Sequence, residues 1–418
     1  MVKFLEQNDL ITKCQHAYRK GHSTTTCLVE IINKLYRNID EGHLTGLAKL
    51  DLSKAYDSIS HSLLLSKLAE LGLSENSINY IKSYLTNRKQ RTKFQNCISD
   101  IEKVQSGIPQ GSILGPILFV CFTNDLEKQF KNKCKIVSYA DDTVLIVTAK
   151  EKNMLKTSLE NVIKLAQDWY TKNSMKNNIG KTEILIMEKR EQKCKFSIEV
   201  QHENENIIIK PKPILWILGI YVDQKLNWDK QIKHVKKRSM NAIINLSRAK
   251  YILPEKSKTL IYNTLVTPHY AYADVVWGGC GKINAKKLQR TQNFALRTIK
   301  NKRKRYSSKE LRNSMKYLDL AGKRKVHEAV FITKAMLNIT SQNVTDEYLR
   351  YLPFEKTRQG TNGNLKIPKH KTSLFQNSPL YRTIKTWNEI PKSLEKDNPK
   401  ILKKRYQNYL IQNQLEKP

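Results

Sequence analysis

The feature that most restricts the fold of this chain is a run of strand-forming residues interrupted by two adjacent aspartates, Asp141 and Asp142. Residues 135–139 and 143–147 are rich in Ile, Val, Leu and Tyr, which favour strands, and aspartate is common where a hairpin turns. The stretch 135–147 therefore predicts a β-hairpin that carries two carboxylates at its tip.

Helical periodicity surrounds this hairpin in the first 230 residues. Apolar residues recur at helical spacing over residues 24–38, and the short apolar run at 47–52 that follows them predicts a buried strand. The same reasoning predicts helices over 60–71, 75–85 and 152–173, and strands over 181–187 and 214–222. Helices and strands mixed in this order predict an α+β fold.

The rest of the chain has a different character, because its periodic segments are helical and rich in Lys and Arg. Helices are expected over 229–250, 255–265, 282–300 and 399–415, whereas the polar residues 338–377 are interpreted as a loop-rich connector. We therefore expect three regions, which are residues 1–230, a helical region 231–310 and a basic C-terminal region 311–418.

The net charge restricts the partners of the chain. The 418 residues include 74 Lys and Arg against 38 Asp and Glu, so the formal charge is +36. A field of this sign attracts phosphate polymers. Hydrophobic residues make up 39% of the sequence, which excludes a wholly disordered basic tail. The longest apolar stretch, residues 113–122, falls well short of the roughly 20 residues needed to span a bilayer.

Two further patterns bear on location. No signal peptide is recognisable at the start of the sequence. The 7 cysteines are scattered without a Cys-x-x-Cys pair, so they indicate neither a disulfide framework nor a zinc site. We therefore expect the chain in the nucleus, the cytoplasm or both, with no membrane partner.

Asp51 adds a third carboxylate, because it ends an apolar run and a sheet can bring it beside Asp141 and Asp142. At about 4 Å, each like-charged pair costs roughly 4 kcal/mol at an effective dielectric constant of about 20, so such a cluster must take up protons or bind cations. Carboxylate oxygens suit Mg²⁺ or Mn²⁺, and two such ions can activate a hydroxyl and stabilise a leaving pyrophosphate. The Asp141-Asp142 pair also has a plainer interpretation, as ordinary turn chemistry.

Three motifs in order carry more weight than one pair of acids. They are residues 51–57 (DLSKAYD), 106–112 (SGIPQGS) and 139–142 (YADD). In this order they resemble motifs A, B and C of the reverse transcriptases of non-LTR retrotransposons, most of all the jockey-type elements of animals. The resemblance extends through residues 268–277, 287–293 and 386–391, and so covers nearly the whole chain.

The resemblance implies a right-hand polymerase palm with partial fingers, followed by a mostly α-helical thumb and C-terminal region. Asp51, Asp141 and Asp142 match the metal-binding triad of the family. The backbone carbonyl of Leu52 matches the position that completes the coordination of one metal ion. The implied cofactor is Mg²⁺ or Mn²⁺.

Further positions match residues that handle the nucleotide and the template. Tyr56 matches an aromatic residue, usually Phe, that packs against the sugar and excludes a ribose 2′-hydroxyl; the alternative is an aromatic packed under the strand. Gln110 and Gly111 match a turn beside the incoming nucleotide, or form an ordinary turn. Lys181 matches a lysine that protonates the leaving pyrophosphate, or is a solvated side chain.

Arg19 and Lys20 match a fingers segment that lies along the template, where they would contact phosphates. A solvated loop is the alternative at these two positions.

The implied activity is that of an RNA-directed DNA polymerase, a nucleotidyltransferase that adds dNTPs to the 3′-hydroxyl of a DNA primer or target on an RNA template. The sequence opens where relatives carry upstream fingers strands and an endonuclease domain, so it resembles an N-terminally truncated copy. A catalytically impaired or domesticated fragment that only binds nucleic acid stays open as the alternative. Tyr56 argues against polymerisation of ribonucleotides, and the sequence indicates no protein partner.

Overall fold

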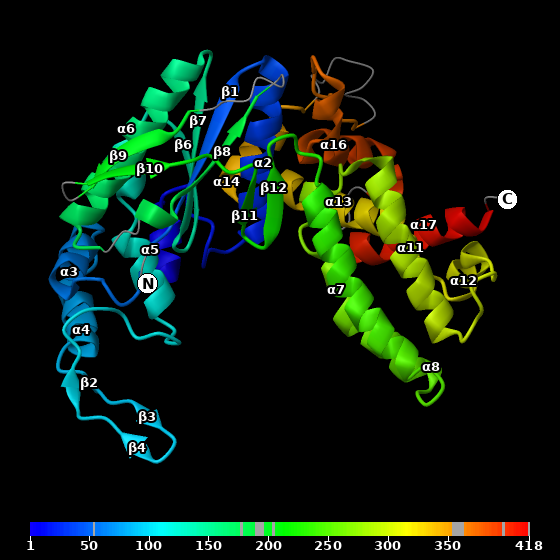
Figure 1. Ribbon diagram of the computed structural model, residues 1–418, viewed down its shortest axis with the longest axis horizontal. Helices are drawn as coiled ribbons and strands as arrows, with labels where there is room; N and C mark the ends of the chain where they lie inside the picture. The colour runs from blue at the N-terminus through cyan, green and yellow to red at the C-terminus, as the bar shows by residue number, and fades with distance from the viewer. Residues whose placement is uncertain are drawn as a thin grey trace. The chain divides into compact units, whose positions relative to one another are not determined.

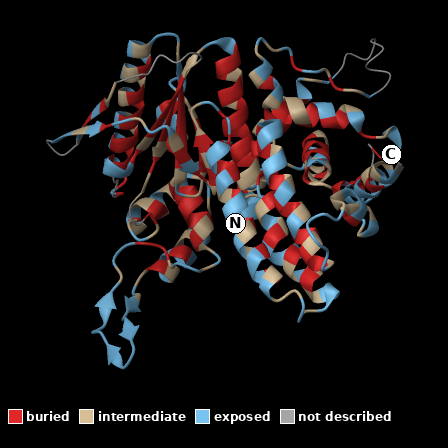
Figure 2. Ribbon diagram, turned by 45° about the vertical axis from the view of Figure 1, so that its right-hand side comes forward, coloured by how far each residue is buried: buried red, intermediate tan, exposed pale blue. Residues whose placement is uncertain are grey.

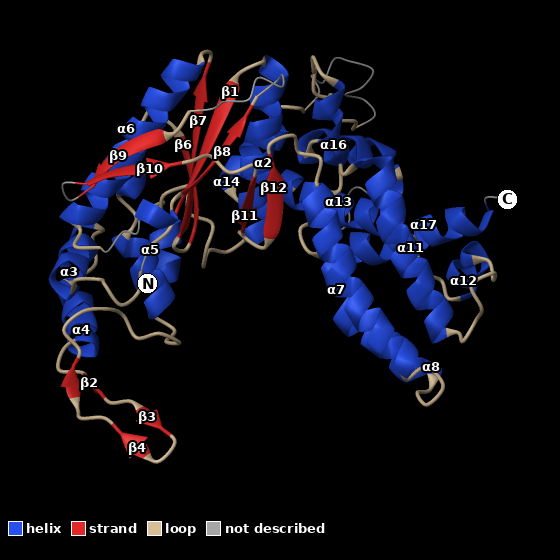
Figure 3. Cartoon of the chain, in the orientation of Figure 1, coloured by secondary structure: helices blue, strands red, loops and turns tan. Residues whose placement is uncertain are grey.

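The computed structural model describes residues 1–52, 55–175, 179–188, 196–202, 205–352, 363–394 and 398–416 (Figure 1). It divides into two compact units. The first unit contains Met1–Ser23 and His43–Pro213, and the second contains Thr24–Gly42 and Ile214–Pro418. Helices and strands are mixed in the first unit and helices dominate the second, which confirms the α+β prediction (Figure 3).

A four-stranded antiparallel sheet forms the centre of the first unit. Its strand order is β6 (Lys135–Tyr139), β7 (Asp142–Ala149), β1 (Leu44–Leu50) and β8 (Glu183–Met187). β6 and β7 form the predicted hairpin, in which Tyr139 pairs with Asp142. Because Leu50 pairs with Thr143 and Lys49 with Glu183, the end of β1 and the starts of β7 and β8 lie at the same edge of the sheet.

Side-chain alternation gives this sheet two different faces. One face carries Ala48 and Leu50 into a core shared with helix α6 (Lys152–Lys172), the helix predicted over 152–173. Gly46 lies on this face, and a Cβ there would stand 2.7 Å from the Leu159 side chain, so glycine lets α6 approach the sheet. The opposite face carries Lys49 and, past the strand end, Asp51.

Smaller elements complete the first unit. The predicted helices over 60–71 and 75–85 are confirmed, and the hydroxyls of Ser60 and Ser74 cap them by accepting from backbone N–H groups. Besides the central sheet and α6, the first unit contains α1 (Val2–Gln7), α3 (His61–Glu70), α4 (Glu75–Leu85), β2 (Lys89–Gln90), β3 (Lys93–Phe94), β4 (Cys97–Ile98), β5 (Glu102–Lys103), α5 (Gly115–Phe122), η1 (Leu126–Phe130), η2 (Ile179–Lys181), β9 (Ile198–His202) and β10 (Glu205–Ile209).

Helix α5 and the strand pair β3–β4 differ in how far their residues are buried. The longest apolar run forms α5, whose residues from Ile117 to Phe122 are buried in the core of the first unit. By contrast, β3 and β4 pair at the tip of a two-stranded arm and are exposed on both strands (Figure 2). None of the described helices has the length and apolar content that a bilayer crossing requires.

Helices build most of the second unit. The predicted helices are confirmed as α7 (Asp229–Arg248), α8 (Glu255–Ile261), α11 (Gly281–Ile299) and α17 (Pro399–Glu416). The segment predicted as a helix over 255–265 continues from α8 into a π-helix. The predicted strand 214–222 is a hairpin that turns at Leu218–Gly219. The elements are α2 (Thr24–Glu41), β11 (Ile214–Ile217), β12 (Ile220–Asp223), α7 (Asp229–Arg248), α8 (Glu255–Ile261), η3 (Tyr262–Val266), α9 (Thr267–Ala271), α10 (Asp274–Trp277), α11 (Gly281–Ile299), α12 (Ser308–Ser314), α13 (Leu320–Met336), α14 (Gln342–Leu349), η4 (Ser373–Asn377), α16 (Pro379–Glu389), η5 (Lys392–Leu394) and α17 (Pro399–Glu416).

The interpretation of residues 338–377 as a loop-rich connector is wrong for its first part. Helix α14 forms there because Val344, Thr345 and Tyr348 make a buried stripe at helical spacing, although the intervening residues are polar. Residues 353–362 of the predicted connector lie outside the described part of the chain.

Helix α2 packs in the second unit although it precedes the central sheet in sequence. Asn33 Oδ1 accepts from the backbone N–H of Leu380 at 3.0 Å, and Arg37 pairs with Glu347 at 2.8 Å. Asp40 accepts from the backbone N–H of Thr372 at 2.7 Å. The three predicted regions stay a prediction about polymerase organisation, since the compact units are defined by packing alone.

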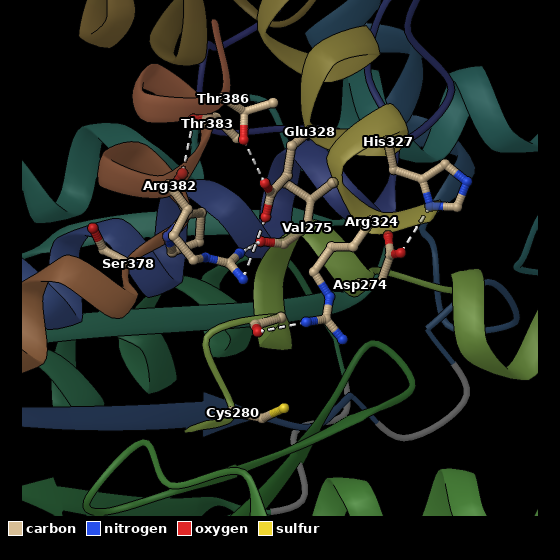
Figure 4. Close-up of polar contacts among 12 residues, drawn as sticks. Asp274, Val275, Cys280, Arg324, His327, Glu328, Ser378, Arg382, Thr383 and Thr386 are labelled. Carbon is tan, nitrogen blue, oxygen red and sulfur yellow. Dashed lines mark hydrogen bonds and ion pairs between the residues drawn. The ribbon is translucent and has the colours of Figure 1, made fainter. Parts of the chain in front are cut away.

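A buried polar network ties α10, α13 and α16 together within the second unit (Figure 4). Arg382 pairs with Glu328, with 3.4 Å between Nη1 and Oε1, and also donates to the carbonyl of Val275. The hydroxyl of Thr386 donates to Oε2 of Glu328 at 2.8 Å. Both charges are thus compensated inside the unit, as buried ions require.

Candidate active site

Strand register brings Asp51 and Asp142 to the same edge and the same face of the central sheet. Leu50 pairs with Thr143 across β1 and β7, so the next position along β1, Asp51, falls opposite Asp142. Both acids continue the face that lies opposite α6, because each is one residue out of step with Leu50 and Thr143. The strand ends that carry these two acids are thus adjacent, and a shared metal site at the three acids stays a prediction.

Lysines accompany both of these acids. Lys49, on the same face, places Nζ 3.3 Å from Oδ1 of Asp142. Lys181, in η2 just before β8, places Nζ 3.9 Å from Oδ2 of Asp51. The motifs predict the position of Lys181, whereas Lys49 had no predicted role.

Asp141 occupies the two-residue turn of the β6–β7 hairpin after Ala140, whose φ is +55°. Gln15 fixes this turn from the side: Oε1 accepts from the N–H of Ala140 at 2.9 Å and Nε2 donates to its carbonyl at 3.3 Å. Desolvation raises the pKa of the Asp141 carboxyl, and the charges of Asp142 and Asp51 raise it further. The three acids therefore lie close enough for their charges to act on one another.

Tyr56 lies five residues after Asp51 and close enough to Asp141 for the charge of that acid to act on its hydroxyl. Its ring stacks on Phe119 of α5, with 4.6 Å between centroids. Its hydroxyl lies 3.2 Å from that of Tyr18. Burial, followed by the Tyr18 contact, raises the pKa of the Tyr56 hydroxyl, so the phenol stays neutral.

The segment before α5 is folded back onto the loop that follows Tyr56. Gly107 has a φ of +88°, and a Cβ there would stand 2.8 Å from the backbone of Asp57, so glycine is required. The Gln110 side-chain amide donates to Oδ1 of Asp57 at 2.9 Å. Gly111 has a φ of +76° with open space around it. The motif B turn is therefore anchored on the motif A loop.

Arg19, Lys20 and Leu52 are the remaining predicted site positions. The guanidinium of Arg19 pairs with Glu6 at 3.0 Å and donates to the carbonyl of Thr12 at 2.8 Å, so it organises its own segment. Lys20 is exposed, and Leu52 is half-buried next to the core of the first unit. Roles for these residues in holding phosphate or metal stay predictions.

A groove of about 490 Å³ opens beside Asp51. Its charged lining residues are mostly cationic: Lys49, Lys181, Lys210 and Lys212 against Asp51 and Glu183. Lys212 and Glu183 form an ion pair with each other. The groove thus has an excess of positive charge next to a carboxylate, which suits a phosphate group more than a neutral ligand.

The donor chemistry of the three aspartates fits a divalent cation. Their oxygens are the hard ligands that Mg²⁺ and Mn²⁺ prefer. Within the described part of the chain, no three acidic, histidine or cysteine side chains are already arranged as a metal cage. Two lysines, Lys49 and Lys181, lie beside these acids.

Comparison with known proteins decides the family. The family model described as "Reverse transcriptase (RNA-dependent DNA polymerase)" matches residues 1–250. This chain belongs to the reverse transcriptase family. The match includes Asp51, Tyr56, Asp141, Asp142 and Lys181, and the sequence prediction of the family is confirmed.

Similar reverse transcriptases come from mobile elements of flies. The chain is 26% identical over 307 residues to the "Probable RNA-directed DNA polymerase from transposon BS" of Drosophila melanogaster, covering 70% of this chain and 33% of that protein. It is 26% identical over 298 residues to the "RNA-directed DNA polymerase from mobile element jockey" of Drosophila funebris, covering 69% and 32%. The chain thus spans about a third of the length of these curated relatives.

Among solved structures, the chain is similar to telomerase from Candida albicans in complex with a fragment of telomeric RNA. The TM-score is 0.39 at 13% identity, and the match covers 84% of this chain and 58% of the telomerase chain.

Three residues that support the site were missed from sequence. Gln15 holds the hairpin turn, Lys49 neutralises Asp142, and Asp57 anchors Gln110. Only Lys49 carried a usable signal, since it is a charge two residues before Asp51 in an otherwise apolar strand and so shares its face.

Proposed function

We propose that this chain is the polymerase part of a non-LTR retrotransposon reverse transcriptase, which extends a DNA primer with dNTPs on an RNA template. The observation that supports it most is the shared edge and face of Asp51 and Asp142, with Asp141 on the adjoining hairpin turn. In a member of the reverse transcriptase family, this is where the polymerisation chemistry is expected. The net charge of +36 supports RNA and DNA as the polymers held.

In the proposed reaction the primer 3′-oxygen forms a bond to the α-phosphorus of the dNTP, and the bond from that phosphorus to pyrophosphate breaks. The 3′-hydroxyl proton passes to water. Lys181, whose side chain is 64% exposed, gives a proton to the leaving pyrophosphate. The ring of Tyr56, held by Phe119 and Tyr18, packs against the deoxyribose, and the Gln110–Gly111 turn borders the nucleotide.

Members of this family normally use a divalent metal. Here Asp51, Asp141, Asp142 and the carbonyl of Leu52 would hold Mg²⁺ or Mn²⁺. When bound, such a metal lowers the pKa of a hydroxyl and neutralises phosphate charge. Lys49 and Lys181 pair with Asp142 and Asp51, and a metal would compete with them for these carboxylates; both ion pairs are partly exposed and therefore weak.

Primer extension tests the proposal. The purified chain is given an RNA template, an annealed DNA primer, dNTPs and Mg²⁺ or Mn²⁺, beside Asp141→Ala. Asp168→Ala is the matched control, because Asp168 is an exposed acid on α6. We expect extension by the unmodified chain and by Asp168→Ala, and its abolition in Asp141→Ala.

Two results would contradict the proposal. Equal extension by Asp141→Ala would remove this acid from the reaction. No extension by the unmodified chain, with salt-sensitive binding of the template and primer intact, would leave a chain that only binds nucleic acid.

A further inference from the structure

A cavity of about 340 Å³ lies wholly within the second unit, between α9, α11, α13 and α17. Its volume is in the range of about 300 to 1,000 Å³ that small-molecule sites occupy in proteins. It belongs to a different compact unit from Asp51, Asp141 and Asp142. The proposed polymerase chemistry uses none of its lining residues.

Positive charge dominates the lining of this cavity. Four cations, Lys316, Lys323, Arg324 and Lys403, face a single carboxylate, Asp274. That carboxylate is engaged already, because His327 Nδ1 lies 2.8 Å from its Oδ2 (Figure 4). The cavity therefore has cationic charge left over for a ligand.

Lys323 is the most unusual of these cations. Burial alone lowers its pKa to about 8, and no carboxylate pairs with it among the described residues. Instead its Nζ lies 5.1 Å from the ring centre of Tyr317 and 5.6 Å from that of Tyr262. Lys323 is half-buried, and a partly desolvated ammonium without a counter-ion is unfavourable, so a bound anion would stabilise this arrangement.

Aromatic and amide groups stand beside the cations. Tyr317, Tyr270 and Trp277 line the cavity, and the Tyr317 hydroxyl donates to Oδ1 of Asn263 at 3.1 Å. Arg324 lies over the Trp277 ring, 5.5 Å from its centre, and its buried Nε has no hydrogen-bond partner in the described part of the chain. Flat rings suit a base, and an amide suits the polar edge of a base.

We propose that this cavity binds one nucleotide unit, with its phosphate held by Lys323 and the cations at the rim and its base against the tyrosine rings. An inorganic anion alone would leave the aromatic lining without a role, and an apolar ligand would leave Lys323 unpaired. The same chemistry is offered by a free nucleoside monophosphate and by one residue of an RNA strand, and the test separates these sources.

Equilibrium dialysis with labelled adenosine monophosphate tests the site on the full chain. EDTA is present, so that metal-dependent nucleotide binding at the three aspartates does not contribute. Lys323→Met removes the half-buried charge at similar length, and Lys334→Met, which changes an exposed lysine on the same helix α13, is the matched control. We expect Lys323→Met to weaken binding at least about tenfold, since charge-assisted contacts are lost, and Lys334→Met to leave it unchanged.

Cross-linking locates the ligand and separates its sources. An azido-adenosine monophosphate should label peptides that contain Tyr317 or Asn263, and Asp141→Asn should not alter the labelling. Labelling of these peptides by a photoreactive single-stranded RNA, without dialysis binding of the monophosphate, would assign the site to a residue of a strand.

Other outcomes would overturn the proposal. These are equal affinity of Lys323→Met and the unmodified chain, or labels confined to peptides outside the cavity. Lys323→Met should melt no lower than the unmodified chain, because it loses a desolvated charge. If it does melt lower, Lys403→Met, at the exposed rim, supplies the same test without touching the core: it must weaken binding, and unchanged binding would refute the site. Primer extension is measured in parallel, so failure here is distinct from failure of the polymerase proposal.

Discussion

Lys49 and Asp142 form an ion pair across strands β1 and β7, with 3.3 Å between Nζ and Oδ1. Both side chains lie on the face of the sheet that also carries Asp51. Lys49 therefore offsets repulsion between acids at the end of the sheet. If Asp142 holds a metal ion, as we propose, Lys49 would compete with that ion for the same oxygen.

Replacing Lys49 by Met should lower the Mg²⁺ concentration that gives half-maximal primer extension. The side chains are 17% and 40% exposed, so the pair is worth no more than about 1 kcal/mol, and the shift should be up to about fivefold. Lys156→Met, which breaks ion pairs with Glu160 and Glu199 away from the acids, is the control. A Mg²⁺ requirement that stays the same or rises in Lys49→Met would contradict the competition.

Replacing Tyr56 by Ala should admit ribonucleotides. The Tyr56 ring is held by stacking on Phe119 at 4.6 Å, so its loss opens space on the order of one sugar hydroxyl. We expect the ratio of kcat/KM for dNTP over rNTP to fall by about 10- to 100-fold, whereas Tyr56→Phe keeps the ring and the preference. An unchanged ratio in Tyr56→Ala, measured by single-nucleotide incorporation, would remove the assigned sugar contact.

Two glycines of motif B give a matched pair of stability predictions. Gly107→Ala places a Cβ 2.8 Å from the Asp57 backbone at a φ of +88°, so the free energy of unfolding should fall by about 3 kcal/mol or more. Gly111→Ala meets nothing within 4 Å and should cost only about 1 kcal/mol. Urea unfolding measures both, and equal losses would contradict the close approach. If the Gly111 turn borders the nucleotide, Gly111→Ala should still raise KM for dNTP.

Local patterns sufficed for the elements that carry the acids. Alternating β-favouring residues around Asp141 and Asp142 predicted the hairpin, and the apolar run before Asp51 predicted β1. Their register could not be predicted, because it depends on hydrogen bonds between strands far apart in sequence. The role of Lys49 became visible only with that register.

Long-range packing accounts for most of what the sequence did not reveal. The apolar periodicity of α2 predicts a helix, but it does not identify residues 371–380 and α14 as the segments against which this helix packs. In the sequence Gln15 is only a polar residue in a loop, and its hydrogen bond to the backbone of Ala140 depends on the tertiary fold. Helix α14 was missed because only Val344, Thr345 and Tyr348 are buried among polar neighbours.

The pKa of Asp141 is raised by desolvation and then by the charges of Asp142 and Asp51, so the folded chain holds this proton more tightly than the unfolded chain. The stability that this contributes is complete below the unfolded pKa of about 3.9 and is lost as the pH rises through the folded pKa. Asp141→Asn should therefore raise Tm near pH 7 in EDTA, with a gain that shrinks on acidification. Asp168→Asn should show no such gain, and a lower Tm for Asp141→Asn near pH 7 would refute the electrostatic account.

The Arg382–Glu328 pair should be worth more as a pair than as two separate charges. Glu328 is 4% exposed and accepts from Thr386 at 2.8 Å, so Arg382→Met leaves a buried carboxylate without its cation (Figure 4). We expect the free energy of unfolding to fall by about 3 to 5 kcal/mol in this variant. The double variant Arg382→Met, Glu328→Met removes both charges and should recover most of the loss in urea unfolding. Additive losses in the double variant would show that the two side chains act independently.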